Sequence, residues 1–169
     1  MVCYMKDSKQ VRVQDGERPG TAQFLRHIFR SDDVVYVFVK SRDLSKNPQY
    51  SGCYKLGSAE KLVQDVMQHD RQALGIYYSL NPVSKDCLSK ANNCLVPAST
   101  LKSISSSDVV RRSLLLIDID PKRVADVSAT KEEKKSARII AESVYSDLRM
   151  RGWPKPIVID SGNGYHLLY

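Results

Sequence analysis

The sequence predicts an α/β (α+β) fold in which a mixed sheet is covered by helices. Two observations lead to this prediction. Three stretches show the periodicity of amphipathic helices, and short runs of β-branched and other apolar residues lie between them. Helices and strands that alternate in this way along a chain of 169 residues pack as helices on a sheet.

Size and composition indicate one globular domain over residues 1–169. The chain is 42% hydrophobic and 27% charged, which is typical of proteins with a real core. A serine-rich stretch at 101–110 is interpreted as a loop inside that domain. It separates an N-terminal portion, residues 1–108, from residues 109–169, which contain the motifs discussed below.

The predicted helices cover residues 21–31, 58–70 and 130–150. Thr21 is the expected N-cap of the first, Ser58 precedes the second, and Thr130 with Glu133 forms a capping box for the third. Lysine and arginine side chains of the third helix are expected on its solvated face: Lys131, Lys134, Lys135 and Arg138. The apolar stripes expected in the core are Phe24, Leu25, Ile28 and Phe29; Leu62, Val63, Val66 and Met67; and Ala137, Ile140, Ala141, Val144, Tyr145 and Leu148.

Strands are predicted where apolar runs lack helical periodicity. Turn-forming residues or the predicted helices bound each run. The runs are residues 34–40, 74–80, 113–120, 156–160 and 165–169.

Charge and cysteine content limit the classes of function. The net charge is +7 and the pI is near 9.2, which favours a polyanionic partner such as nucleic acid or nucleotide. No apolar run reaches the roughly eighteen residues of a membrane span, so we expect a cytoplasmic protein with no membrane association. The four cysteines lack CxxC spacing and are expected to be reduced thiols: Cys3, Cys53, Cys87 and Cys94.

The apolar run "LLLIDID" ends in two carboxylates. Alternation along a strand places Asp118 and Asp120 on the same face, just before Pro121 ends the strand. An apolar strand is typical of burial on both faces, and a buried carboxylate needs a cation nearby. Two carboxylates at this spacing can converge on one divalent ion or bridge two. The alternative is an ordinary strand end whose acids face water.

The stretch "DSGNGYHLLY" reads as a strand, a tight turn and a second strand. Gly162 and Gly164 allow positive φ angles and leave backbone N–H groups bare, which suits close approach of a phosphate. The same residues also make ordinary hairpin turns. His166 follows in extended chain, where a lone histidine is more often structural than functional.

The order and spacing of these two motifs resemble those of the archaeo-eukaryotic primase superfamily, the primase-polymerases. The wider phrases "IYYSLNPV", "RRSLLLIDIDP", "SATKEEKKSA" and "DSGNGYHLLY" look like the catalytic domain that opens phage- and plasmid-type primase-helicases. The resemblance covers about residues 75–169 and implies an RNA-recognition-type core. It implies that Asp118, Asp120 and His166 are catalytic and that Asp118 and Asp120 chelate Mg²⁺ or Mn²⁺. The triphosphate of the incoming nucleotide would be held by Ser161, Gly162, Gly164 and His166.

The function implied is that of a DNA primase/polymerase, a template-dependent nucleotidyltransferase that makes primers during DNA replication by two-metal phosphoryl transfer. Its partners would be nucleoside triphosphates and a single-stranded DNA template, with Arg111 and Arg112 contacting template phosphates. The alternative kept open is a non-catalytic remnant that binds single-stranded nucleic acid. An aspartyl-nucleophile phosphohydrolase is disfavoured, because Lys122 stands where such enzymes have Thr or Val. A sugar-nucleotide transferase with DxD on a loop stays open as an alternative, although it does not explain "SGNGYH".

Members of this superfamily carry a third acidic residue well after SGxGxH, whereas this sequence ends three residues after His166. We therefore expect an incomplete catalytic domain, truncated after this motif, from a larger primase-helicase whose helicase portion lies on the full-length chain. Absence of the following strands would leave the apolar surface around Leu167 and Leu168 open.

Overall fold

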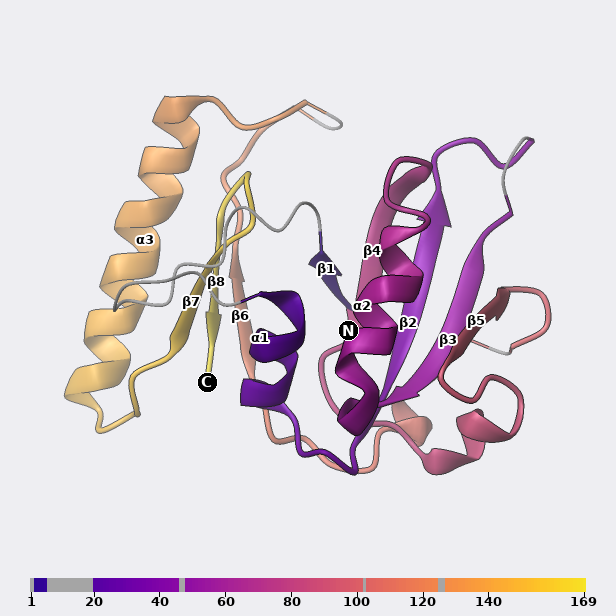
Figure 1. The fold of residues 1–169 in the computed structure, drawn as a ribbon. Coiled ribbons are helices and arrows are strands. Elements are labelled where there is room, and N and C mark those ends of the chain that lie inside the picture. The colour runs from indigo at the N-terminus through magenta and orange to yellow at the C-terminus, as the bar shows by residue number, and fades with distance from the viewer. Residues whose placement is uncertain (1, 6–19, 46–47, 102, 125–126) are drawn as a thin grey trace. The chain divides into compact units, whose positions relative to one another are not determined.

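The computed structural model describes residues 2–5, 20–45, 48–101, 103–124 and 127–169 (Figure 1). The chain divides into two compact units, whose described parts are residues 2–5 and 20–113 in the first and 114–169 in the second. Each unit has its own sheet, and helices accompany both, so the α+β class is confirmed. The neighbouring strands of both sheets are antiparallel, so the prediction of a mixed sheet was wrong.

The first unit is built on a five-stranded sheet of order β1-β4-β2-β3-β5. Strands β2 and β4 confirm two predicted runs. Strand β3 was not predicted, because Ser51 and Gly52 interrupt its apolar pattern. Gly52 is needed there, since a Cβ atom on it would lie 2.3 Å from the carbonyl oxygen of Cys94 in β5. The strands are β1 Val2–Met5, β2 Val34–Ser41, β3 Tyr50–Lys55, β4 Ala73–Ser79 and β5 Cys94–Pro97.

Two short α-helices pack against each other in this unit, and α2 also contacts β3 and β5. Gly20, not Thr21, is the N-cap of α1, so that prediction was wrong. Burial raises the pKa of Tyr54 well above its usual value, and its hydroxyl donates to Asp65 of α2 at 2.8 Å. The helices are α1 Thr21–Ile28 and α2 Ala59–Met67, with 3-10 turns η1 Leu56–Ser58, η2 Lys85–Ser89 and η3 Ser106–Asp108.

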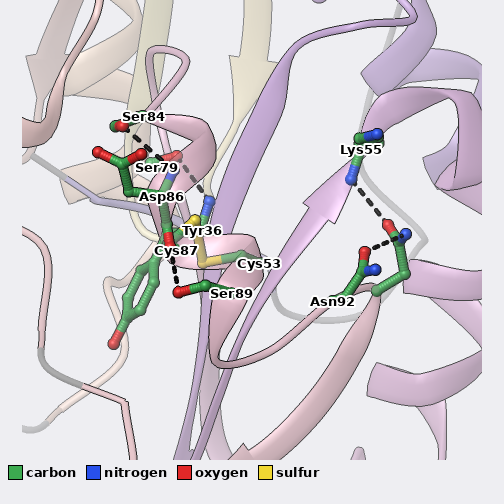
Figure 2. The surroundings of a disulfide bond; sticks show 10 residues. Tyr36, Cys53, Lys55, Ser79, Ser84, Asp86, Cys87, Ser89 and Asn92 are labelled. Atoms are coloured by element: carbon green, nitrogen blue, oxygen red, sulfur yellow. Dashed lines mark hydrogen bonds between the residues drawn. A yellow bond between two sulfur atoms is a disulfide. The ribbon is translucent and has the colours of Figure 1, made fainter.

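A disulfide joins Cys53 of β3 to Cys87 of η2, with Cα atoms 6.0 Å apart (Figure 2). The expectation of reduced thiols was therefore wrong for these two residues, while Cys94 is a free thiol. The pairing could not be predicted, because 34 residues separate the two cysteines and only the fold brings them together. The cluster around Cys53 also contains Val34, Tyr36, Val83, Ala91 and Leu101.

The second unit contains a three-stranded sheet of order β6-β8-β7 and one long helix. Because β8 lies between β6 and β7 and is antiparallel to both, the β6-α3-β7 connection is a split β-α-β unit. Strand β6 is shorter than the predicted 113–120. The elements are β6 Leu116–Ile119, α3 Lys131–Met150, β7 Ile157–Asp160 and β8 Tyr165–Leu168.

Helix α3 begins after the predicted capping box of Thr130 and Glu133, which is confirmed. Its two buried residues are alanines, Ala137 and Ala141, and small side chains allow a helix to approach a sheet closely. They pack with Ile119 and Leu167. The prediction that Ile140 belongs to the core was wrong, because it is 53% exposed. The surface expected to be open at Leu167 and Leu168 is also not found, since these residues are 1% and 2% exposed.

Candidate functional site

The register of β6 and β8 brings the two motifs together. Asp118 is the cross-strand partner of His166, and the next pair is Ile119 with Tyr165. The His166 Nε2 atom lies 3.2 Å from Asp118 Oδ1. Because the strands are antiparallel, the end of β6 adjoins the start of β8 and the turn that precedes it. Residues some forty positions apart therefore lie together where β6 ends and β8 begins.

The carboxylates are exposed, so the prediction of a buried pair was wrong. The Asp118 side chain is 46% exposed, whereas the His166 side chain is 12% exposed. Asp120 is also exposed. An antiparallel sheet can leave one face in contact with water, so an apolar run does not require burial of its acids. Neither carboxylate needs a cation to offset burial, and both can be reached by one from solution.

The turn between β7 and β8 uses its two glycines for different reasons. Gly162 has a φ of +91°, which favours glycine. Gly164 is required by close approach, because a Cβ atom on it would lie 2.2 Å from the carbonyl oxygen of Ile119 and 2.6 Å from Asp120 Oδ1. Glycine allows a positive φ angle at both positions, and Gly162 adopts one whereas Gly164 does not. The hairpin tip is thereby pressed against the end of β6.

The turn amides are not bare, contrary to the sequence-based expectation. The Gly164 N–H donates to Ser161 Oγ at 2.9 Å, and the Gly162 N–H donates to Asp160 Oδ1 at 2.9 Å. The Ser161 N–H donates to the Gly164 carbonyl oxygen at 3.1 Å. A phosphate at this turn would therefore meet side chains first, above all the Ser161 hydroxyl, which keeps its own proton to donate.

Three residues near the turn were missed by sequence reasoning. Asp160 accepts the Gly162 N–H and also pairs with Lys134 of α3, whose Nζ lies 2.8 Å from the same Oδ1 atom. Asn163 accepts the Ala129 N–H at 3.1 Å, which ties the hairpin tip to the segment before α3. An aspartate two residues before a glycine is typical of an Asx-turn, so Asp160 could have been found. Lys134 offered no such signal and was expected on the solvated face.

Arg111 has a partner in its own unit rather than at the turn. Its guanidinium donates to both carboxylate oxygens of Asp33, which is buried. Burial raises the pKa of Asp33, but hydrogen bonds from Arg111 and from the Arg30 N–H outweigh it and hold this pKa below its usual value. Contact of Arg111 with a template phosphate stays a prediction and would compete with this pair. Arg112 is exposed.

The donor set fits a hard divalent ion in kind. Asp118 and Asp120 supply carboxylate oxygens, the ligand type that Mg²⁺ and Mn²⁺ prefer. No cluster of three or more metal-ligating His, Cys, Asp or Glu side chains occurs among the residues that the structure describes. Ions bound by these two carboxylates would need further ligands from water and from substrate phosphates. Within the described chain, no helix is both long and apolar enough to traverse a lipid bilayer.

Comparison with known proteins does not assign a family. No protein-family model, no curated protein and no solved structure matches this chain. Any function must therefore be argued from the residues and from their arrangement at the edge of the second sheet.

Proposed function

We propose that the chain contains the catalytic core of a DNA primase/polymerase, a template-dependent nucleotidyltransferase related to the primase-polymerases. One observation carries the proposal: the end of β6, with Asp118 and Asp120, adjoins the turn that precedes His166. Metal-binding oxygens and phosphate-binding groups are both required for nucleotidyl transfer, and here they lie side by side. The split β-α-β connectivity of the second unit supports an RNA-recognition-type core.

Each residue has a role that its geometry allows. Asp118 and Asp120 would hold Mg²⁺ or Mn²⁺ at the exposed end of β6, and the chemistry supplied there would be a lowered pKa of the attacking 3′-hydroxyl and neutralisation of charge on the α-phosphate. Ser161 donates its hydroxyl proton to a phosphate oxygen, because its Oγ already accepts the Gly164 N–H. His166, whose side chain is 12% exposed and whose Nε2 lies 3.2 Å from Asp118 Oδ1, is assigned to contact the triphosphate.

The surroundings fit a replication enzyme. The net charge of +7 favours a polyanionic template, and exposed Arg112 is available to contact its phosphates. We place the protein in the cytoplasm, acting on nucleoside triphosphates and single-stranded DNA as part of a larger phage- or plasmid-type primase-helicase.

The test is calorimetric titration of ATP and dATP in the presence of Mn²⁺. The Asp118→Asn, Asp120→Asn double variant is expected to lose metal-dependent binding that the unaltered chain shows. The control is Glu142→Gln, Asp147→Asn, which removes the same charge from surface ion pairs of α3. Binding that survives in the first variant, or falls equally in the control, would contradict the proposed site.

A second candidate function is single-strand binding without catalysis. It is favoured by the two turn amides, which already donate inside the turn rather than toward a ligand. This function predicts that fluorescence anisotropy with labelled single-stranded DNA is unchanged by Asp118→Ala. It also predicts no metal-dependent binding of ATP or dATP in the calorimetric experiment.

A further inference from the structure

We propose that Lys134 and Asp160 form a positioning pair that holds the turn of residues 161–164 in its nucleotide-binding conformation. The link to nucleotide affinity rests on the proposed function. The structural part, support of the turn by helix α3, stands on the geometry alone. Both residues lie in phrases that carry the resemblance, Lys134 in "SATKEEKKSA" and Asp160 in "DSGNGYHLLY", but neither was assigned a role in the site.

A single oxygen connects the helix to the turn. Asp160 Oδ1 lies 2.8 Å from Lys134 Nζ and also accepts the Gly162 N–H at 2.9 Å. The two side chains are 26% and 25% exposed, so they are partly shielded from water. With its carboxylate held by the lysine, Asp160 is kept in the rotamer that reaches Gly162.

Lys134 also contacts the residue on the other side of the turn. Its Nζ lies 5.9 Å from the centroid of the Tyr165 ring, within cation–π range. Tyr165 is the cross-strand partner of both Asp160 and Ile119. Lys134 therefore contacts both the residue before the turn, Asp160, and the residue after it, Tyr165.

The other ion pairs of α3 among the described residues do not connect the helix to another element. Arg138 with Glu142, and Arg151 with Asp147, join residues four apart on one helix, and all four side chains are more than half exposed. These pairs tie the helix only to itself. Lys134 instead joins α3 to the β7–β8 hairpin, 26 residues further along the chain.

A groove of about 530 Å³ lies between α3 and the β7–β8 hairpin, so a side chain that lines it can be replaced without disturbing a packed core. Lys134 and Asp160 line it together with Val158 and Leu167. Replacing Lys134 leaves the buried alanines of α3 in place, so the helix itself is expected to stay folded. The effect of such a change should be confined to the turn and to what it binds.

The experiment combines amide hydrogen exchange at Gly162, measured by NMR, with titration of Mn²⁺ and ATP. Lys134→Gln is expected to speed Gly162 exchange and to raise the Kd for ATP by about fivefold, the upper range for a partly exposed pair. Lys134→Arg should restore most of both, because a guanidinium can also pair with the carboxylate. Lys135→Gln, an exposed neighbour, should change neither.

Nonadditivity provides a second readout. Asp160→Asn keeps an oxygen for the Gly162 N–H but loses the charge that pairs with Lys134. If the two residues act as a unit, the double variant with Lys134→Gln should show no larger Kd than either single variant. Additive effects would overturn the pairing.

The outcomes separate this inference from the proposed function. Unchanged Gly162 exchange in Lys134→Gln would overturn the positioning role, whatever the nucleotide result. Faster exchange, with no ATP binding by the unaltered chain, would overturn the proposed function and leave support of the turn intact. Equal loss of ATP affinity in Lys134→Gln and Lys135→Gln would show that general charge, not the pair, is responsible, and would also overturn the inference.

Discussion

The two units of the molecule bury their charged groups differently. In the first unit, the Asp33 side chain is 4% exposed and is neutralised by Arg111. In the second, Asp118 is 46% exposed beside His166. A buried charge must be paired for the fold to survive, whereas an exposed one adds little to stability. The difference indicates that the first unit uses Asp33 to hold the chain together, whereas the second leaves Asp118 and Asp120 in contact with solvent.

The hydrophobic cores of the two units also differ, in the size of the side chains that they bury. Large side chains such as Tyr54, Leu25 and Leu62 are fully buried in the first unit. The smaller sheet of the second unit is covered through two alanines of α3. Substitutions in the first unit should therefore act on stability, and those at the end of β6 on ligand binding.

The largest expected effect is confined to the first unit. Reduction of the Cys53–Cys87 disulfide opens a loop closed by residues 34 apart and should lower the free energy of unfolding of this unit by about 3 to 4 kcal/mol. Tyrosine near-ultraviolet circular dichroism during denaturant unfolding would measure it. The single tryptophan, Trp153, contacts Tyr169 in the second unit, so its fluorescence transition should stay unchanged. A Cys53→Ser, Cys87→Ser variant should not respond to reductant, and a shift in the tryptophan transition would show that the units unfold together.

The same kind of substitution, alanine for a closely packed glycine, can be made once in each unit. A Cβ atom at Gly52 or Gly164 would lie 2.3 or 2.2 Å from a backbone oxygen, so alanine at either should cost about 3 kcal/mol in its own unit. Gly164→Ala should lower the tryptophan-detected transition and weaken ATP binding, and Gly52→Ala should do neither. The matched control is Gly152→Ala, where φ is +84° and space is open, with an expected cost of about 1 kcal/mol. Equal effects at 152 and 164 would refute the close-approach argument.

Removal of the Arg111 charge should have an intermediate effect. Arg111→Met leaves Asp33 buried without its cation and should destabilise the first unit by about 2 kcal/mol at neutral pH. Folding lowers the pKa of Asp33. The ionised carboxylate therefore adds to the free energy of unfolding at pH values above the pKa of an unfolded aspartate, and this stabilisation is lost as the pH falls through the lower pKa of the folded state. The free energy of unfolding, measured with denaturant at neutral pH and below about pH 4, should therefore fall less on acidification in Arg111→Met than in the unaltered chain. Arg112→Met is the control, and a similar loss there would point to net charge instead.

Local patterns explain which parts of the fold were predictable. The capping box of Thr130 and Glu133, and the apolar runs that became β2 and β4, depend on neighbouring residues alone. Strand β3 could not be predicted, because Gly52 is fixed by the approach of β5 and not by its own neighbours. The disulfide likewise depends on where η2 lies against the sheet.

The environment of the candidate site was not predictable from the sequence. The cross-strand pairing of Asp118 with His166 depends on the register of β6 and β8, which two separate motifs do not reveal. Exposure of Asp118 was missed because a run of apolar residues does not reveal whether the second face of a sheet is covered. The contact of Lys134 with Asp160 needs the helix and hairpin to be packed together, and helical periodicity alone put this lysine in solvent.

The smallest effect on stability is expected at the residue with the largest expected effect on binding. Asp118→Asn keeps an oxygen near His166 and removes a charge that is 46% exposed, so the free energy of unfolding should change by less than about 0.5 kcal/mol. Tryptophan-detected unfolding without metal would measure this, alongside calorimetry with Mn²⁺ and ATP, which should show lost binding. A loss of stability as large as that of Arg111→Met would mean that the carboxylate supports the second unit as Asp33 supports the first. The contrast between the two units, and with it the strongest structural support for a metal-binding role of Asp118, would then disappear.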